Sequence, residues 1–130
     1  MRTIESLYWI GLRLIEEGME ERQLHLQQWF PYKERETLVS AEESLSAILE
    51  YLNCHDLNEF HATTALMIAP SCNINIAKAL ITNFHQPKST LLLLVSALIG
   101  DKWKEVYQYA LENDFRFLSY GDSCLFFNKN

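Results

Sequence analysis

The stretch ALITNFHQPKSTLLLLVSALIG, residues 79–100, decides the fold class of this chain. Its first part, residues 79–83, reads as a short strand that leads into a polar turn. Ser89 or Thr90 then caps a leucine-rich helix, and Gly100 is a typical residue for the end of that helix. A strand that is followed by a polar turn and a helix predicts an α/β protein with chemistry at the strand end.

The composition is typical of one globular domain rather than of a disordered chain. The chain has 130 residues, of which 48% are hydrophobic, and its formal net charge is −6. This acidic balance argues against a large nucleic-acid-binding surface. The longest apolar run, Leu91–Val95, is too short to cross a membrane, and three well-separated cysteines favour reduced thiols. We therefore expect a cytoplasmic protein that does not associate with membranes.

Hydrophobic periodicity and end signals predict the remaining helices and strands. Further helices are expected over residues 4–18, 40–54 and 101–111, the second of them with a capping box at Ser40. Further strands are expected over residues 24–26, 63–69, 115–118 and 123–127, the last two around a turn. The sequence thus predicts a single α/β unit with a small mixed sheet flanked by helices.

Polar residues cluster where the strand over 79–83 ends and the next helix begins. Asn83 and His85 are expected to project from the carboxyl end of that strand into a crevice. Free backbone N–H groups at Ser89 and Thr90 favour a bound carboxylate or phosphate, and Lys88 adds positive charge. The alternative is structural: Ser89 only caps the helix, and His85 makes a structural hydrogen bond.

A second polar motif, Ser-Tyr-Gly-Asp at residues 119–122, lies between two phenylalanine-rich stretches. Gly121 can adopt a positive φ, which permits a tight turn. Arg116 alternates with the phenylalanines on either side and is expected to face away from them. The alternative is an ordinary hairpin turn in which Asp122 is solvated.

Several common sites are not supported by the sequence. The nearest grouping of metal-binding residue types, Cys54, His55 and His61, matches no established ligand spacing, so we expect no metal site. The chain has no G-x-x-x-x-G-K-[ST], G-x-G-x-x-G or G-x-S-x-G motif. Kinase, P-loop and α/β-hydrolase functions are therefore not expected.

Taken together, the motifs resemble the S-adenosylmethionine:tRNA ribosyltransferase-isomerase family of queuosine biosynthesis. Residues 79–100 resemble the family signature of a strand, an Asn-Phe-His-x-Pro-x-Ser-Thr turn and a Leu-rich helix. FRFLSYGDS, residues 115–123, resembles the closing motif of the family. Residues 63–70 resemble the strand just upstream, and residues 2–6 resemble the segment that follows a Gly-Thr-Thr turn in the family.

The resemblance implies a transfer and isomerisation of the ribosyl group of S-adenosylmethionine onto 7-aminomethyl-7-deazaguanine in tRNA, which gives epoxyqueuosine. S-adenosylmethionine is then a substrate, and no cofactor is expected. The implied catalytic residues are His85, as the proton carrier, and Asp122, as the counter-charge to the sulfonium. The implied substrate-binding residues line two walls of one crevice: Asn83, Ser89, Thr90, Arg116, Ser119, Tyr120 and Gly121.

The chain also departs from this family. Ser71 follows Pro70 where the family has glycine, Lys78 stands where an acidic residue is common, and the inserted β-barrel domain of the longer family members is absent. We expect residues 1–130 to be the C-terminal part of a larger α/β domain, inactive alone, from a parent that is an enzyme. Two alternatives stay open: a non-catalytic ligand-binding domain, and a remnant whose exposed face pairs as a homodimer.

Overall fold

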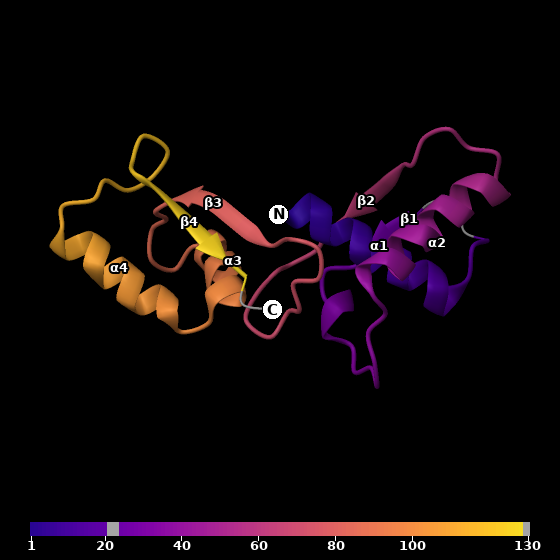
Figure 1. The fold of residues 1–130 in the computed structure, drawn as a ribbon, viewed down its shortest axis with the longest axis horizontal. Coiled ribbons are helices and arrows are strands. Elements are labelled where there is room, and N and C mark those ends of the chain that lie inside the picture. Colours follow the sequence, from indigo (N-terminus) through magenta and orange to yellow (C-terminus); the bar gives the residue numbers. More distant parts are fainter. Residues whose placement is uncertain (21–23, 129–130) are drawn as a thin grey trace. The chain divides into compact units, whose positions relative to one another are not determined.

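The computed structural model describes residues 1–20 and 24–128, which belong to two compact units. The N-terminal unit is Met1–Met67, and the C-terminal unit begins at Ile68. Each unit contains two α-helices and one two-stranded sheet (Figure 1). The predicted α/β class is therefore confirmed, but the expected single mixed sheet is present as two separate sheets, one parallel and one antiparallel.

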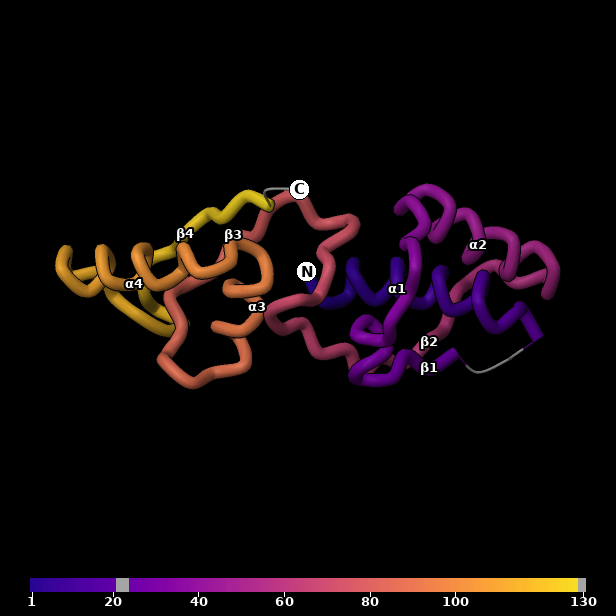
Figure 2. The backbone as a smooth tube through the Cα atoms, turned by 90° about the horizontal axis from the view of Figure 1, so that it is seen from below, coloured from indigo at the N-terminus to yellow at the C-terminus, as the bar shows by residue number. Residues whose placement is uncertain are grey.

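The N-terminal unit is built on two helices that pack against each other (Figure 2). Its elements, in chain order, are α1 (Arg2–Glu17), β1 (Leu24–Leu26), a 3-10 turn (Phe30–Tyr32), α2 (Ala41–Cys54) and β2 (Ala62–Thr64). Strands β1 and β2 are parallel, with Leu24 opposite Ala62. The largest fully buried side chains of this unit include Tyr8, Trp9, Phe30 and Leu26.

Helix ends in this unit follow the signals in the sequence. Helix α1 ends before Gly18, whose φ of 91° is in the region that favours glycine and whose N–H donates to the Leu14 carbonyl at 3.0 Å. Ser40 precedes α2 in a complete capping box: its hydroxyl accepts from the Glu43 N–H, and its own N–H donates to the Glu43 carboxylate. These contacts hold the pKa of Glu43 below its usual value.

A glycine allows α1 and α2 to approach closely. A Cβ atom at Gly11 would lie only 2.0 Å from the carbonyl oxygen of Ser44 in α2. The Ser44 hydroxyl, which is fully buried, donates to the Tyr8 carbonyl at 2.6 Å. Close backbone contact and one buried hydrogen bond therefore fix where the two helices cross.

The C-terminal unit contains the stretch with which the sequence analysis began. Its elements are β3 (Ala79–Asn83), α3 (Thr90–Ile99), α4 (Lys102–Glu112) and β4 (Ser123–Phe127). Strands β3 and β4 lie side by side and antiparallel, with Ala79 opposite Phe127 and Asn83 opposite Ser123 (Figure 1). Ser89 caps α3 and Gly100 follows its last residue, as the sequence predicts.

Two predicted strands differ from the structure. The buried strand expected over 63–69 is a short, exposed strand, β2, although two backbone hydrogen bonds, from Ala65 to Leu26 and from Met67 to Gln28, continue its direction. The strand expected over 115–118 is absent, because these residues form part of a turn-rich loop, and β4 pairs with β3 instead. Among the described residues, no helix is long and apolar enough to cross a membrane.

Candidate functional site

The two polar motifs of the sequence meet at the end of β3. The Asn83 side-chain amide donates to the Leu118 carbonyl at 2.9 Å, and the Leu118 N–H donates to the Phe84 carbonyl at 2.8 Å. These bonds join the strand end to the loop that follows α4, across more than thirty residues of chain. The structure therefore brings the two motifs together at this strand end, while a crevice lined by both of them stays a prediction.

Asp122 closes this loop on Arg116. The Asp122 carboxylate accepts the Arg116 backbone N–H at 2.7 Å and contacts its guanidinium at 3.2 Å. The Asp122 N–H in turn donates to the Arg116 carbonyl at 2.8 Å. The backbone hydrogen bond from Arg116, more than the guanidinium, holds the pKa of the Asp122 carboxyl below its usual value. The motif is thus a closed loop and not the hairpin turn that the sequence allowed.

Gly121 is required for close approach rather than for an unusual φ. The positive-φ glycines of the described chain are Gly18 and Gly100, so Gly121 does not use the positive φ that a glycine permits. A Cβ atom at Gly121 would lie 2.2 Å from the Arg116 carbonyl oxygen. The residues of the loop after α4 with a left-handed backbone are Asp114, with φ of 55°, and Leu118, with φ of 69°.

Aromatic side chains of the loop pack against the end of β3 and against α4. Phe84, which is 3% exposed, packs its ring against Phe115 and Phe117, with centroids 5.5 and 5.4 Å apart. Tyr107 from α4 contacts the same ring at 5.3 Å. Arg116 is exposed, so it faces away from the two phenylalanines as predicted, although no strand is present.

His85 is held at two points. Its Nε2 lies 2.7 Å from the Thr82 hydroxyl oxygen, and its backbone N–H donates to the Tyr107 hydroxyl at 3.1 Å. The residue is half-buried, and this burial lowers the pKa of the imidazole below its usual value. At neutral pH, His85 is therefore mainly in its neutral form, the form that can accept a proton.

Thr82 and Tyr107 contact His85, Cys124 contacts Thr82, and none of the three was identified as a site residue from the sequence. The Cys124 thiol donates to the Thr82 carbonyl at 3.2 Å. Burial raises the pKa of both the Cys124 thiol and the Tyr107 phenol. Sequence patterns treat Tyr107 as a core residue of a helix, and no local signal places it beside a histidine more than twenty positions earlier.

The start of α3 borders an open, mainly apolar surface. The Ser89 hydroxyl accepts from the Leu92 N–H at 3.4 Å, so Ser89 caps the helix. The Ser89 N–H donates to the Gln86 carbonyl at 3.4 Å, so the expectation that this N–H is free is wrong. Ser89, Thr90 and Lys88 line a pocket of about 310 Å³ that extends to Trp103. A second pocket of about 490 Å³ is lined by residues of the turn after β3, of α3 and α4, and of the loop, including Gln86, Trp103 and Leu118. None of the predicted site residues lines this second pocket, although Gln86 follows His85 in the chain.

The remaining predicted residues, Ser119 and Tyr120, are exposed on the loop. Tyr120 is 96% exposed, which is unusual for an aromatic side chain within an otherwise bonded loop. Their predicted contact with substrate stays a prediction. In the described part of the chain, no group of three or more His, Cys, Asp or Glu side chains is placed to hold a metal ion.

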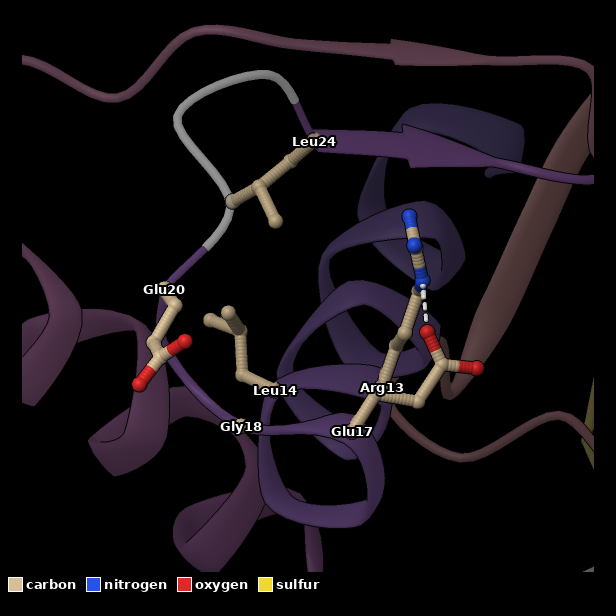
Figure 3. Close-up of a pocket in the computed structure, with 6 residues that line it drawn as sticks. All are labelled: Arg13, Leu14, Glu17, Gly18, Glu20 and Leu24. Atoms are coloured by element: carbon tan, nitrogen blue, oxygen red, sulfur yellow. Dashed lines mark hydrogen bonds and ion pairs between the residues drawn. The ribbon is translucent and has the colours of Figure 1, made fainter.

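The N-terminal unit also carries pockets. One of about 600 Å³ is lined by residues of α1 and α2 and of the chain beside them, including Ile15 and Glu43. A smaller one of about 160 Å³ is shown in Figure 3. Its lining comes from the end of α1 and the chain just after it, and includes an ion pair between Arg13 and Glu17 at 2.6 Å. None of the residues predicted from the two motifs lines either of these N-terminal pockets. The candidate site is therefore assigned to the C-terminal unit.

Comparison with known proteins identifies the family. The model of the family described as "Queuosine biosynthesis protein" matches residues 35–126, a range that contains both polar motifs. This chain belongs to that family. The sequence resemblance is thereby confirmed, and the matched range includes the whole loop from Arg116 to Asp122.

The queuosine-family relatives are longer than this chain. The S-adenosylmethionine:tRNA ribosyltransferase-isomerase of Jannaschia sp. (strain CCS1) is 51% identical over 72 residues, which are 55% of this chain and 20% of that protein. The enzyme of the same name from Vesicomyosocius okutanii is 54% identical over 68 residues, 52% of this chain and 20% of that protein. The chain thus spans about a fifth of the length of these relatives.

A solved structure is also similar. The crystal structure of an S-adenosylmethionine tRNA ribosyltransferase from Thermotoga maritima shares 37% sequence identity with this chain, at a TM-score of 0.49. The match covers 62% of this chain and 30% of that one.

Proposed function

We propose that this chain forms one part of the catalytic centre of an S-adenosylmethionine:tRNA ribosyltransferase-isomerase. Membership of the queuosine biosynthesis family supports the reaction class. The observation that carries the proposal is the bond between Asn83 and the Leu118 carbonyl, which joins the two motifs at one strand end. Strand ends are where α/β enzymes assemble their active sites.

The proposed reaction moves the ribosyl group of S-adenosylmethionine to the amine of 7-aminomethyl-7-deazaguanine in tRNA. A new C–N bond forms, the bonds to adenine and to the methionine sulfur break, and the ring becomes an epoxycyclopentane. Atoms and charge balance when adenine, methionine and one proton are released. The sulfonium acidifies the neighbouring C–H bonds, so a group that accepts a proton is needed.

The described residues fit these needs. Neutral His85 is the proposed proton acceptor, since burial lowers its pKa and leaves it unprotonated at neutral pH. Asp122 is the proposed counter-charge to the sulfonium, shared with Arg116, and its low pKa keeps it ionised. The pocket of about 490 Å³, which is lined by Gln86 next to His85 but not by His85 or Asp122 themselves, has the size and apolar character of sites for small molecules. We assign S-adenosylmethionine to this side of the molecule.

The tRNA is expected to contact other parts of the complete enzyme. The chain has a net charge of −6, and binding of phosphates requires clustered positive charge. We therefore propose a cytoplasmic enzyme whose nucleic-acid surface lies largely outside these residues. Because the chain spans about a fifth of the length of its relatives, we expect no turnover by this chain alone.

The test is a turnover assay with S-adenosylmethionine and tRNA that carries 7-aminomethyl-7-deazaguanine. Mass spectrometry of digested tRNA detects epoxyqueuosine, and chromatography detects adenine and methionine. The full-length enzyme that contains this chain is expected to form all three products, and its His85→Ala variant to form none. Full turnover by His85→Ala would remove the proton-acceptor role.

A separate measurement tests Asp122. Asparagine keeps an oxygen that accepts the Arg116 N–H but lacks the negative charge. Asp122→Asn is therefore expected to weaken the affinity for S-adenosylmethionine while the affinity for S-adenosylhomocysteine, which has no sulfonium, stays the same. Equal affinities of the variant and the wild type for both ligands would exclude the counter-charge role.

One observation favours self-association as a second candidate function. On one face of the β3–β4 sheet, Ile81 is 74%, Leu125 52% and Phe127 66% exposed, and Ile81 lies opposite Leu125. Adjacent exposed apolar side chains on a small sheet favour pairing with another surface. Light scattering is expected to find a dimer of this chain that Ile81→Ser converts to a monomer. A wild-type monomer at all concentrations would exclude this candidate.

A further inference from the structure

His85 is fixed in a way that leaves a single ring nitrogen open. Tyr107 accepts its backbone N–H at 3.1 Å, and the Thr82 hydroxyl lies 2.7 Å from Nε2. Within the described residues, Nδ1 of His85 makes no hydrogen bond. The hydrogen bond between Thr82 and Nε2 therefore decides whether Nδ1 carries a proton or can accept one.

A threonine hydroxyl can either donate to or accept from an imidazole nitrogen. If Thr82 donated to Nε2, Nδ1 of neutral His85 would carry the proton and could not accept another. If Thr82 accepts from Nε2–H, Nδ1 keeps its lone pair. The same Thr82 oxygen then also accepts from the imidazolium that forms after proton transfer, in a stronger, charge-assisted bond.

We propose that Thr82 is a positioning residue that accepts a hydrogen bond from Nε2–H of His85 and so makes Nδ1 the proton-accepting atom. The inference deepens the proposed function, on which its catalytic consequence rests. Tyr107 supports the arrangement by anchoring the backbone of His85 to α4. Thr82 thus acts through His85 and does not itself touch the reacting atoms.

The other groups around His85 do not replace Thr82. Tyr107 of α4 bonds to the His85 N–H and Cys124 of β4 bonds to the Thr82 carbonyl. Burial raises the pKa of both groups, so both are neutral at pH 7. Helix α3, TLLLLVSALI, contributes no titratable side chain. The Thr82 oxygen is therefore the acceptor that favours imidazolium formation within this cluster.

The chain itself offers a matched control. His25 in β1 has the same kind of contact, with its Nδ1 2.8 Å from the Thr63 hydroxyl oxygen. The change Thr82→Val keeps a branched strand residue of similar shape but removes the hydroxyl, and Thr63→Val does the same for His25. Each variant should therefore change one histidine and leave the other as an internal standard.

Nitrogen-15 NMR of labelled histidines in this chain tests the assignment. Wild-type His85 is expected in the Nε2-protonated tautomer. In Thr82→Val, its titration midpoint is expected to move to lower pH, because the imidazolium loses an acceptor. Thr82→Ser is expected to keep the wild-type midpoint, and Thr63→Val to leave His85 unchanged. An Nδ1-protonated wild-type His85, or equal midpoints in wild type and Thr82→Val, overturns the proposal.

Kinetics of the full-length enzyme separate this inference from the proposed function. Thr82→Val is expected to lower kcat roughly 10- to 100-fold, with KM for S-adenosylmethionine within about twofold and the acidic limb of the pH profile moved to lower pH. Thr82→Ser is expected to restore kcat to within about threefold. A moved NMR midpoint with an unchanged kcat would support the tautomer assignment and would overturn the catalytic role of His85.

Discussion

The change Gly121→Ala tests whether the loop from Arg116 to Asp122 is closed as the structure shows. The added Cβ atom would lie 2.2 Å from the Arg116 carbonyl oxygen and 2.7 Å from the Phe117 carbonyl carbon. These are backbone atoms, so no side-chain rotation can relieve the overlap. The loop must open before an alanine fits.

The size of the effect follows from that distance. Ordinary contacts of a Cβ atom begin near 3.4 Å, so the two segments must separate by about 1.2 Å, from 2.2 to 3.4 Å. Overpacking of this kind costs roughly 1 to 3 kcal/mol. Because each 1.4 kcal/mol is a factor of ten, local opening of the loop should become roughly 5- to 150-fold more frequent.

Native-state hydrogen exchange of this chain measures the opening. The Asp122 and Leu118 amides donate at 2.8 Å to the carbonyls of Arg116 and Phe84, and both should exchange faster in Gly121→Ala by that factor. Gly100→Ala is the control at a glycine of the other kind: its φ of 62° favours glycine, but its Cβ would meet no atom within 4 Å. The control should destabilise the end of α3 and leave the loop amides unchanged.

Equal exchange rates for these two amides in the wild type and Gly121→Ala would refute the reasoning. That result would mean that the Arg116 carbonyl oxygen does not lie close to the Cα atom of Gly121. A uniform acceleration of all amides in the C-terminal unit would also contradict it, because the predicted opening is confined to the exposed loop. The proposed function adds a second readout: the same variant of the proposed complete enzyme is expected to lose turnover, since the loop carries one motif of the proposed site.

Three other changes probe the fold and its charges. Gly11→Ala should lower the free energy of unfolding of the N-terminal unit by about 1 to 2 kcal/mol, because the clash with Ser44 exceeds the gain in helix propensity. Urea unfolding measures this free energy, and an unchanged unfolding midpoint would contradict the close helix crossing. Ser40→Ala should cost about 1 kcal/mol in the same assay through loss of the helix cap, and no loss would argue against the capping box. Burial holds the folded-state pKa of His85 below 6.5, so the C-terminal unit should lose stability as pH falls from about 6.5 through that lower pKa; His85→Gln should remove this dependence, and an identical pH profile would exclude it.

Local end signals in the sequence predict the helices well. Ser40 and Ser89 precede helices as caps, and Gly18 and Gly100 follow them, all at the expected positions. These signals are reliable because a cap satisfies backbone groups of its own first or last turn and needs no distant partner. The strand over 79–83 was also found at its predicted bounds.

The sequence was less informative where partners are distant. Alternation of Phe115, Arg116 and Phe117 has the period of a strand, but the phenylalanines share a side because both pack on Phe84, which comes from another part of the chain. Pairing of β3 with β4 spans two helices, and no local pattern encodes it. The division of the chain after Met67 likewise has no linker composition to mark it.

The site residues divide into those that build the loop and those that are open to a substrate. The side chains of Asn83 and Asp122 are hydrogen-bonded to the backbone of Leu118 and Arg116. Nδ1 of His85, by contrast, makes no hydrogen bond within the described residues. Replacing a residue of the first kind moves the loop, so loss of turnover alone would not show that it contacts substrate. Exchange protection of the loop amides must be measured beside each activity. A side chain is shown to act in the reaction only when its variant keeps this exchange protection and loses activity.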